Sequence, residues 1–383
     1  MALKKIWILT SINGNELKGK MKKELIVCDL LQAKEELISL LHPFRLHVYT
    51  AQKQLAEFKY LKENLKVEHI IIHEDFAENF MLKQQGEIMA AHWNSTQVTL
   101  FTCIVYYRNN ETLELEHTNY VVVSDDLNHT KDSVFSFNTA IVEDLKQTVI
   151  FSRIHYWSDG CGAQFKNQYN MQNLMLHMHY HGVSADWNFF GTAHGKGAVD
   201  GLGAVVKRNV WFGILRKQYV INTAKEFLKV AKKETPHINI NYISGVDIQK
   251  CINKFALTEK WERATSISGI HSMHFAQPVG LDILDFWKHS CFTDKKDPDE
   301  KIEILCPVQD KQLSSALCTE LLKKSDWVSV MYDDNWWPGV VEDMDDKYLY
   351  LSFMKPLGRN KFFWPRIPEK DKILKENILT KLD

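Results

Sequence analysis

The chain of 383 residues is 45% apolar and 11% aromatic, which is enough for two or three packed domains. Its formal charge of −1 excludes a nucleic-acid binder that works by bulk positive charge, so contacts with a polyanion must use local basic patches. The seven scattered cysteines include no CxxC pair, which is typical of a reducing compartment and argues against a zinc knuckle. No apolar run approaches the roughly 18 residues needed to span a membrane, so we expect an intracellular protein with no membrane partner.

Residues 1–66 are interpreted as a helical N-terminal region. Leucines at mixed three- and four-residue spacing predict a helix from residue 23, and a second helix is expected over Gln52 to Asn64. His42-Pro43 lies between the two and predicts a break.

Residues 67–218 carry the pattern of an α/β domain. β-branched runs, a hairpin and apolar residues at helical spacing predict the order βββαβαβα, which is the order of a ribonuclease-H-like domain, a mixed sheet flanked by helices. The expected strands are Val67 to His73, Val98 to Tyr107, a return leg ending at Ser124, Val149 to Ser158, and Asp186 to Phe190. The expected helices are Ser133 to Lys146, Asn167 to His179, and a third that Asp200 opens.

The rest of the chain is interpreted in two parts. Residues 219–318 are expected to form a lysine-rich helical extension, although 242–317 has no clear pattern. Residues 319–383 change character, because short β-type runs alternate there with turn residues. This pattern predicts a small β-barrel that folds as an independent module.

Three aspartates suggest a reactive site in the predicted α/β domain. Aspartate is depleted in strands because its short carboxylate competes for backbone hydrogen bonds, yet Asp75 and Asp159 close two predicted strands and Asp200 follows a third. Converging carboxylates repel one another unless a cation neutralises them, and oxygen-only ligands favour magnesium or manganese. Two such ions would clamp the attacking and leaving oxygens of a phosphodiester displacement. Each aspartate alone has a structural alternative, as a turn residue or a helix cap.

Three other motifs give weaker evidence of a reactive site. The segment AHGKGAVDGLG follows a strand and precedes a helix, but Asp200 stands where a dinucleotide loop needs its third glycine, so no nucleotide cofactor is expected. The alternating histidines of HMHYH (177–181) lack further ligands at zinc spacing, which favours surface or core histidines. Cys161 and His194 are a thiol and an imidazole, but no third group that would orient the base is identified.

Five segments also carry a resemblance. These are HEDFAENF (73–80), QQGEIMAAHWN (84–94), VVVSDDLNH (121–129), HYWSDGCGAQFKN (155–167) and HGKGAVDGLGAVVKR (194–208). Together they resemble the catalytic region of transposase-derived proteins of the DDE/D group, which descend from transposable elements and have a ribonuclease-H-like core. The similarity covers roughly Leu55 to Trp211. It implies that Asp75 bridges two Mg²⁺ or Mn²⁺ ions, that Asp159 binds one, and that Asp200 binds the other.

The resemblance also bears on partners. Transposases act as multimers, which implies a homo-oligomer. Two departures indicate a truncated or domesticated descendant: no cysteine-histidine DNA-binding finger precedes the core, and an insertion rich in Gln, Glu and Met occupies Phe76 to Trp93.

Several basic side chains are predicted to contact DNA. His194 and Lys196 stand just before the third acid, where we expect them to contact the scissile phosphate. The others stand on the helix that follows and just beyond it, and are expected to bind backbone phosphates. These are Lys207, Arg208, Arg216 and Lys217.

The C-terminal segment resembles Tudor-type or Src-homology-type barrels. Trp327, Tyr332, Trp336 and Trp337 stand near several aspartates, and such rings attract the cation of a methylated lysine. A methyl-lysine cage would make chromatin or another peptide the partner of this segment. The alternative is that the rings fill a small core.

Two functions follow from these observations. The first is a metal-dependent polynucleotidyl transferase or nuclease that acts on DNA phosphodiesters in the nucleus. The second is a domesticated, catalytically inactive protein that binds DNA or chromatin. The distance between the three carboxylates distinguishes the two functions, because only the first requires them to converge around a space for metal.

Overall fold

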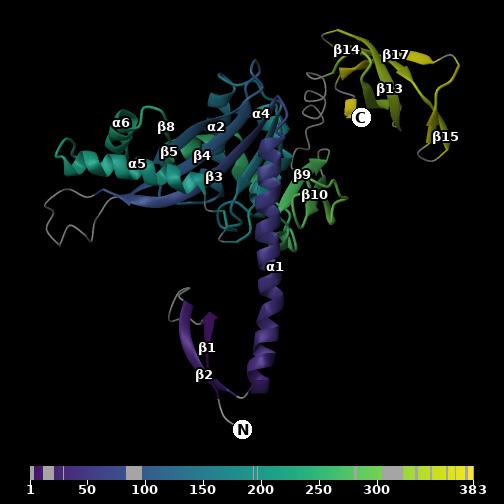
Figure 1. Ribbon diagram of the computed structural model, residues 1–383. Helices are drawn as coiled ribbons and strands as arrows, with labels where there is room; N and C mark the ends of the chain where they lie inside the picture. The colour runs from purple at the N-terminus through teal and green to yellow at the C-terminus, as the bar shows by residue number, and fades with distance from the viewer. Residues whose placement is uncertain are drawn as a thin grey trace.

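The computed structural model describes residues 4–11, 21–28, 30–82, 97–192, 194–195, 197–279, 283–303, 322–332, 335–345, 347–358, 361–366, 368–375 and 378–382 (Figure 1). It contains a large mixed sheet with helices on both faces and a separate antiparallel sheet near the C-terminus. The protein is therefore of the α/β class. No helix among the described residues is both long and apolar enough to cross a membrane.

The N-terminal region differs from the prediction. β1 (Lys4–Ser11) and β2 (Met21–Cys28) form an antiparallel hairpin, and α1 (Leu30–Glu63) is one helix that continues through Pro43. The predicted break at His42-Pro43 is wrong. Ser39, whose carbonyl loses its usual donor at Pro43, is exposed, so water can satisfy that carbonyl. Figure 1 shows the N-terminal half of α1, which contains Pro43, extending away from the large sheet.

The central elements follow the predicted order βββαβαβα. β3 (His69–Met81), β4 (Gln97–Arg108) and β5 (Leu115–Ser124) pair antiparallel, while β6 (Arg153–Ser158) and β7 (Ser184–Phe189) add in parallel beside β3. The intervening helices are α2 (Lys131–Leu145), α3 (Gln168–Met175), α4 (His177–His181) and α5 (Ala198–Leu215). Residues 83–96, which include most of the predicted insertion, lie outside the described part of the chain.

The predicted helical extension contributes strands as well as helices. Its elements are α6 (Ala224–Glu234), β8 (Asn239–Tyr242), α7 (Gly245–Lys254), α8 (Leu257–Glu262), a 3₁₀ turn at Ile270–Ser272, β9 (Phe275–Val279), β10 (Ile283–Trp287) and β11 (Glu300–Glu303). β8 pairs with β5, and β9 to β11 continue the sheet beyond β7, which gives the order β11-β10-β9-β7-β6-β3-β4-β5-β8. Strands of four or five residues are too short for a clear alternation pattern, and pairing with an existing edge stabilises them.

The two faces of the large sheet bury different side chains of the same strands. Ile70 and Ile72 of β3 pack under α2 and α3, whereas Ile71 packs with α5, α6 and the C-terminal part of α1. Successive side chains of a strand point to opposite faces, so His73 and Asp75 share the face of Ile71. On β6, Trp157 belongs to that same face. We call it the α5 face.

The C-terminal strands form a second unit with its own core. β12 (Trp327–Tyr332), β13 (Asn335–Met344), β14 (Tyr348–Phe353), β17 (Glu369–Leu374) and β18 (Ile378–Leu382) have the order β17-β14-β13-β12-β18, and β15 (Lys355–Gly358) pairs with β16 (Lys361–Phe363). Val328, Val330 and Leu349 are among the side chains buried in this unit. Its observed form is an antiparallel sheet whose edge strands β17 and β18 do not pair with each other among the described residues.

Candidate functional site

Asp75 and Asp159 occupy matching positions on two neighbouring parallel strands. The last register pair between β3 and β6 joins His73 to Trp157, and each aspartate stands two residues farther along its strand direction. Alternation places both on the α5 face. Asp75 and Asp159 therefore occupy neighbouring register positions, and Asp159 lies just beyond the end of β6. The prediction that Asp75 closes its strand is wrong, because β3 continues to Met81.

Asp200 is in the first turn of α5, the helix that covers this face. Its Oδ2 accepts a 2.8 Å hydrogen bond from the backbone N–H of Gly197, so the carboxylate caps the helix. The capping alternative for Asp200 is thus realised, and one of its oxygens is used for that purpose. The helix begins at Ala198, two residues before the predicted position.

Backbone amides also hold the other two carboxylates. Asp75 Oδ1 accepts from the N–H of Phe76 at 2.8 Å, and Asp159 Oδ1 accepts from the N–H of Cys161 at 2.9 Å. Burial raises the pKa of Asp159, while this backbone bond and the charge of Lys166 act in the opposite direction. The backbone N–H of Cys161 and the ammonium of Lys166, which both favour the charged form of Asp159, are therefore part of the site.

A glycine joins the loop before α5 to the end of β6. A Cβ on Gly195 would lie 3.3 Å from Asp159 Cβ, which is tighter than ordinary packing, and 3.6 Å from its Cα. Since Gly195 is buried, a side chain there would push this loop away from Asp159. The glycine thus lets the segment that carries Asp200 approach the strand that carries Asp159.

His73 connects β3 to that loop. The side chain is buried, and a Cβ on Gly197 would lie 3.9 Å from its Cε1. Burial lowers the pKa of His73 to about 4, while the backbone of Gly195 and the charge of Asp200 act to raise it. His73 is therefore neutral at pH 7, and its Nδ1 has no hydrogen-bond partner among the described residues.

Two residues of the site were missed by the sequence interpretation. Lys166 is 3% exposed; its Nζ would lie 3.7 Å from a Cβ on Gly160 and donates to the carbonyl of His271 at 3.2 Å. Burial lowers its pKa to about 8, and Asp159 acts to raise it. The available signal was a lysine flanked by Phe165 and Asn167 shortly after a strand-end aspartate.

Glu74 is the second missed residue, on the opposite face of β3. It is fully buried, and its Oε1 accepts from Asn138 Nδ2 at 3.2 Å while Oε2 has no partner among the described residues. Burial raises its pKa to about 8, with Asn138 lowering it and the neighbouring charge of Asp75 raising it. The signal in the sequence was a glutamate at a position of the β-branched strand that alternation assigns to the core.

The donor set fits a hard divalent ion in chemistry, because it consists of carboxylate oxygens. No group of three acidic, histidine or cysteine side chains is gathered into a metal-binding cluster within the part of the chain that the structure describes. Three carboxylates repel one another unless a cation lies between them. The predicted ligation by Asp75, Asp159 and Asp200 therefore stays a prediction, which added Mg²⁺ or Mn²⁺ can test.

The predicted DNA contacts are spread along α5. His194 is exposed and its Nε2 lies 3.1 Å from Nε2 of His47 on α1; Lys207 donates to the carbonyl of Glu78 at 3.1 Å. Arg208, Arg216 and Lys217 are exposed, and at a rise of about 1.5 Å per residue Arg216 lies about 24 Å along the helix from Asp200. Lys196 lies outside the described residues. Arg216 and Lys217 are thus remote from the aspartates.

The C-terminal tryptophans are not equivalent. Trp327 is partly buried, with its ring centroid 5.5 Å from that of Trp364, and Trp337 packs against the core of the small sheet. The side chains of Tyr332 and Trp336 lie outside the described part of the structure. Core packing therefore accounts for Trp337, and the cage stays a prediction for the others.

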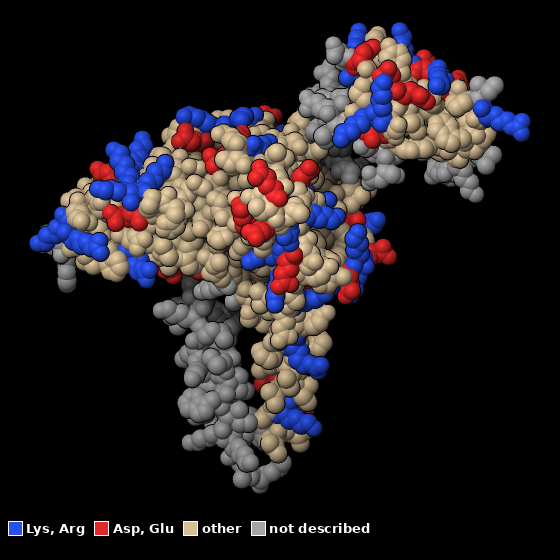
Figure 2. Space-filling model, turned by 45° about the horizontal axis from the view of Figure 1, so that its top comes forward, with Lys and Arg blue, Asp and Glu red and all other residues tan. Residues whose placement is uncertain are grey.

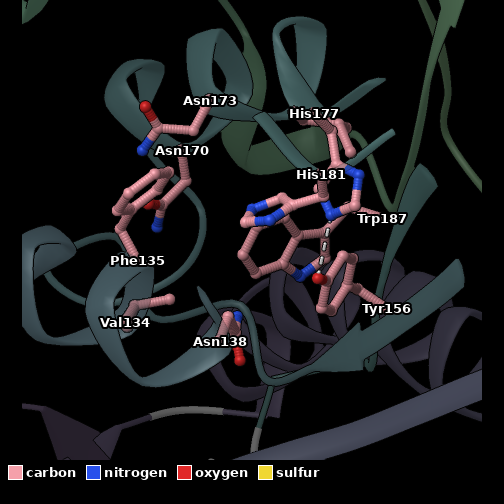
Figure 3. A pocket seen from close by; sticks show the side chains of 10 residues that line it. Val134, Phe135, Asn138, Tyr156, Asn170, Asn173, His177, His181 and Trp187 are labelled. Carbon is pink, nitrogen blue, oxygen red and sulfur yellow. Dashed lines mark hydrogen bonds between the residues drawn. The ribbon is translucent and has the colours of Figure 1, made fainter. Parts of the chain in front are cut away.

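Two of the three histidines of 177–181, His177 and His181, line a small cavity (Figure 3). His177 and His181 are buried, as expected for core histidines; His177 Nδ1 is 2.8 Å from the carbonyl of Val183 and its Nε2 is 3.0 Å from Tyr156 Oη. Figure 3 shows these rings and Trp187 on one side, with Asn170 and Asn173 opposite. The volume of about 20 Å³ suits a single water molecule and excludes an organic ligand.

Comparison with known proteins gives one match. Residues 54–290 match a family model described as "Domain of unknown function (DUF8701)". No curated protein and no solved structure is significantly similar to the chain. The matched range runs from the C-terminal part of α1 to just beyond β10 and covers the large sheet apart from its edge strand β11.

Proposed function

This chain belongs to the DUF8701 family, and we propose that its large α/β unit is a ribonuclease-H-like domain that performs metal-dependent cleavage or transfer of DNA phosphodiesters. The element order βββαβαβα supports the fold. The sheet order β5-β4-β3-β6-β7 does so as well, with the first three strands antiparallel and the last three parallel. Under this proposal the chain derives from a transposase of the DDE/D group.

One observation carries the proposal. Asp75, inside β3, and Asp159, just beyond β6, occupy equivalent register positions on adjacent parallel strands, and the helix that covers the same face has Asp200 in its first turn. A structural turn residue needs no acid on the neighbouring strand, and a helix cap needs no acid on the sheet below. Three acids at one end of one face are accounted for together by a cation-binding role.

The residues would divide the chemistry as follows. Two Mg²⁺ or Mn²⁺ ions, held by Asp75, Asp159 and Asp200, would polarise the phosphodiester and stabilise the attacking and leaving oxygens. Lys166 would supply a positive charge near Asp159 that offsets part of the repulsion between the three carboxylates. His194 and Lys196 would contact the scissile phosphate, and Gly195 lets their loop reach the end of β6.

Incubation with end-labelled duplex DNA and manganese tests the enzyme. We expect nicked or joined products with the native chain and none with Asp159→Asn, whose side chain keeps its size but loses its charge. Asp297→Asn, an exposed acid in the loop after β10, is the matched control and should retain activity. Products that persist in Asp159→Asn would contradict the three-aspartate site.

The second candidate is a domesticated protein that binds DNA or chromatin without cutting it. The observation that favours it is the engagement of each aspartate by a backbone amide, together with the basic side chains over α5 and α6. Figure 2 shows these cations gathered at the end of the molecule that those helices form. Exposed members are Arg208, Arg216, Lys217, Lys225, Lys229, Lys232 and Lys233. Retained DNA binding without any product would select this function.

The C-terminal unit is proposed to be a Tudor-like or Src-homology-like barrel that binds a peptide. The exposed Trp364 supports an aromatic site, because its ring lies beside that of Trp327. Titration with lysine- and trimethyllysine-containing peptides tests the cage. Tighter binding of the methylated peptide, lost in Trp327→Ala, is expected; equal binding of both would contradict a cage.

Two further properties stay proposals. A nuclear location follows from the DNA substrate. A homo-oligomer follows from the transposase resemblance, and light scattering of the purified chain would decide it: a monomer mass at micromolar concentration would contradict it.

A further inference from the structure

A pocket of about 530 Å³ lies on the sheet face that the C-terminal part of α1 covers. Its floor includes His69 and Arg153, the first residues of β3 and β6. Small-molecule sites typically measure about 300–1,000 Å³. At about 3.3 Å per residue, His69 is about 20 Å from Asp75 along β3, so this pocket is separate from the aspartates.

The floor is built by strand register. His155 pairs with Asp186 across β6 and β7, Gln277 pairs with Asp285 across β9 and β10, and all four side chains line the pocket. Five adjacent strands, from β3 to β10, thus present polar side chains to one cavity. A sheet face buried under a helix is usually apolar, so this row of polar groups indicates a site.

Part of this row is a fixed hydrogen-bond chain. Asp186 Oδ2 lies 2.7 Å from His155 Nδ1 and 3.2 Å from Arg153 Nε, and its Oδ1 accepts from Asn188 at 2.9 Å. His155 Nε2 in turn lies 3.0 Å from His69 Nδ1. Burial, with the charges of His155 and Arg153, lowers the pKa of His69 to about 4. These side chains are locked, and their charges are compensated within the chain.

Asp285 is the exception in this row. It is 7% exposed, lines the pocket, and its Oδ1 has no hydrogen-bond partner among the described residues. An unpaired buried acceptor is costly, because it has lost its hydrogen bonds to water. A ligand that donates N–H groups to Asp285 would remove that cost.

The walls add aromatic surface and positive charge. Phe275 and Trp287 stack with centroids 4.6 Å apart, and Phe292 lies 5.5 Å from Phe275. The rim carries three exposed lysines: Lys66, Lys295 and Lys296. A ligand matched to this pocket therefore has a flat ring with N–H donors and an anionic group.

We propose that the pocket binds a nucleoside monophosphate. The base would pack on the aromatic wall and donate to Asp285, and the phosphate would meet the rim lysines. Guanine offers neighbouring ring N–H and amino donors that suit one carboxylate, so GMP should bind most tightly. The source is a free nucleotide or the end of a nucleic-acid strand. This pocket is unrelated to the glycine-rich loop before α5.

Calorimetric titration of the full chain with GMP, AMP, CMP and UMP tests the proposal. We expect saturable binding of one GMP, at least tenfold weaker binding of guanosine, and at least tenfold weaker GMP binding in the surface variant Lys295→Glu/Lys296→Glu. Lys301→Glu, an exposed lysine on β11, is the matched control and should bind as the native chain does. Absence of GMP binding at millimolar concentration would overturn the proposal.

A second variant tests the role of Asp285. Asp285→Asn should bind GMP at least tenfold more weakly with an unchanged melting profile; equal affinity would overturn the assigned contact. Competition by a 5′-phosphorylated oligonucleotide would assign the site to strand ends, and its failure to compete would assign it to free nucleotides. Asp159→Asn should bind GMP normally, so failure of the aspartate site and failure of this pocket are distinguishable.

Discussion

The buried ammonium of Lys166 lies near enough to the carboxylate of Asp159 for each charge to act on the pKa of the other. Lys166 Nζ would be 3.7 Å from a Cβ on Gly160, the residue after Asp159, and each group acts on the pKa of the other in the direction that favours charge. Charges buried without a partner are costly. The charge of Lys166 therefore offsets part of the cost of burying the Asp159 carboxylate at the end of β6.

Manganese should raise the melting temperature of the native chain. An ion that binds only the folded acid cluster shifts unfolding by mass action, by about 2.7 kcal/mol when its concentration is 100 times its Kd. Differential scanning fluorimetry with millimolar MnCl₂ measures the shift. Asp159→Asn should lose it and Asp297→Asn should keep it; a shift of equal size in all three proteins would count against the site.

Lys166→Met should remove one pH dependence of the free energy of unfolding. The folded-state pKa, about 8, lies below the ordinary value of 10.5, so the folded state binds fewer protons between these values. Stability from this group therefore rises as the pH goes from 8 to 10.5, by on the order of 2–3 kcal/mol. Urea unfolding at pH 7.5 and 10 measures the rise.

The same variant has a second expected effect. Without the Lys166 ammonium, the charge of Asp159 is less compensated. Lys166→Met should therefore bind manganese more tightly than the native chain does, and it should bind DNA more weakly. Lys301→Met is the control for loss of a lysine elsewhere. A pH dependence of stability that is unchanged in Lys166→Met would show that Lys166 does not titrate in this range.

Glu74→Gln should stabilise the chain above pH 8. Burial raises the pKa of Glu74 to about 8 from 4.5, so the folded state binds more protons between these values. Its contribution to stability is complete below pH 4.5 and falls as the pH rises to 8, by on the order of 3 kcal/mol or more. Chemical unfolding between pH 5 and 9 measures this; a parallel profile in Glu74→Gln would contradict the assignment.

DNA affinity should fall steeply with salt, and the basic end of α5 should set part of the slope. Each phosphate contact contributes about 0.9 to the slope of log K against log salt concentration. Arg216→Glu/Lys217→Glu should therefore reduce the slope by about 2 if both side chains contact phosphates. Fluorescence anisotropy between 50 and 200 mM salt measures it, and Lys370→Glu on the C-terminal sheet is the control. An unchanged slope would remove these residues from the interface.

Local pattern determined the central elements and the positions of the acids. The hairpin from β4 to β5 and the helix α2 follow from alternation and helical spacing, which act between residues close in sequence. Asp75 and Asp159 stood out because strands disfavour aspartate. Pro43 was misleading, since an exposed helix tolerates a lost hydrogen bond that local rules treat as a stop.

Tertiary structure decided everything that depends on pairing between distant strands. β8 to β11 are strands because they complete the edges of a sheet formed by other segments. Asp285 faces a pocket only because β10 pairs with β9, and β9 with β7, which brings it to the same face as His155. Lys166 belongs to the site because the turn after Asp159 brings its ammonium close to Gly160. Such contacts are set by burial and register across the whole sheet, and no local pattern encodes them.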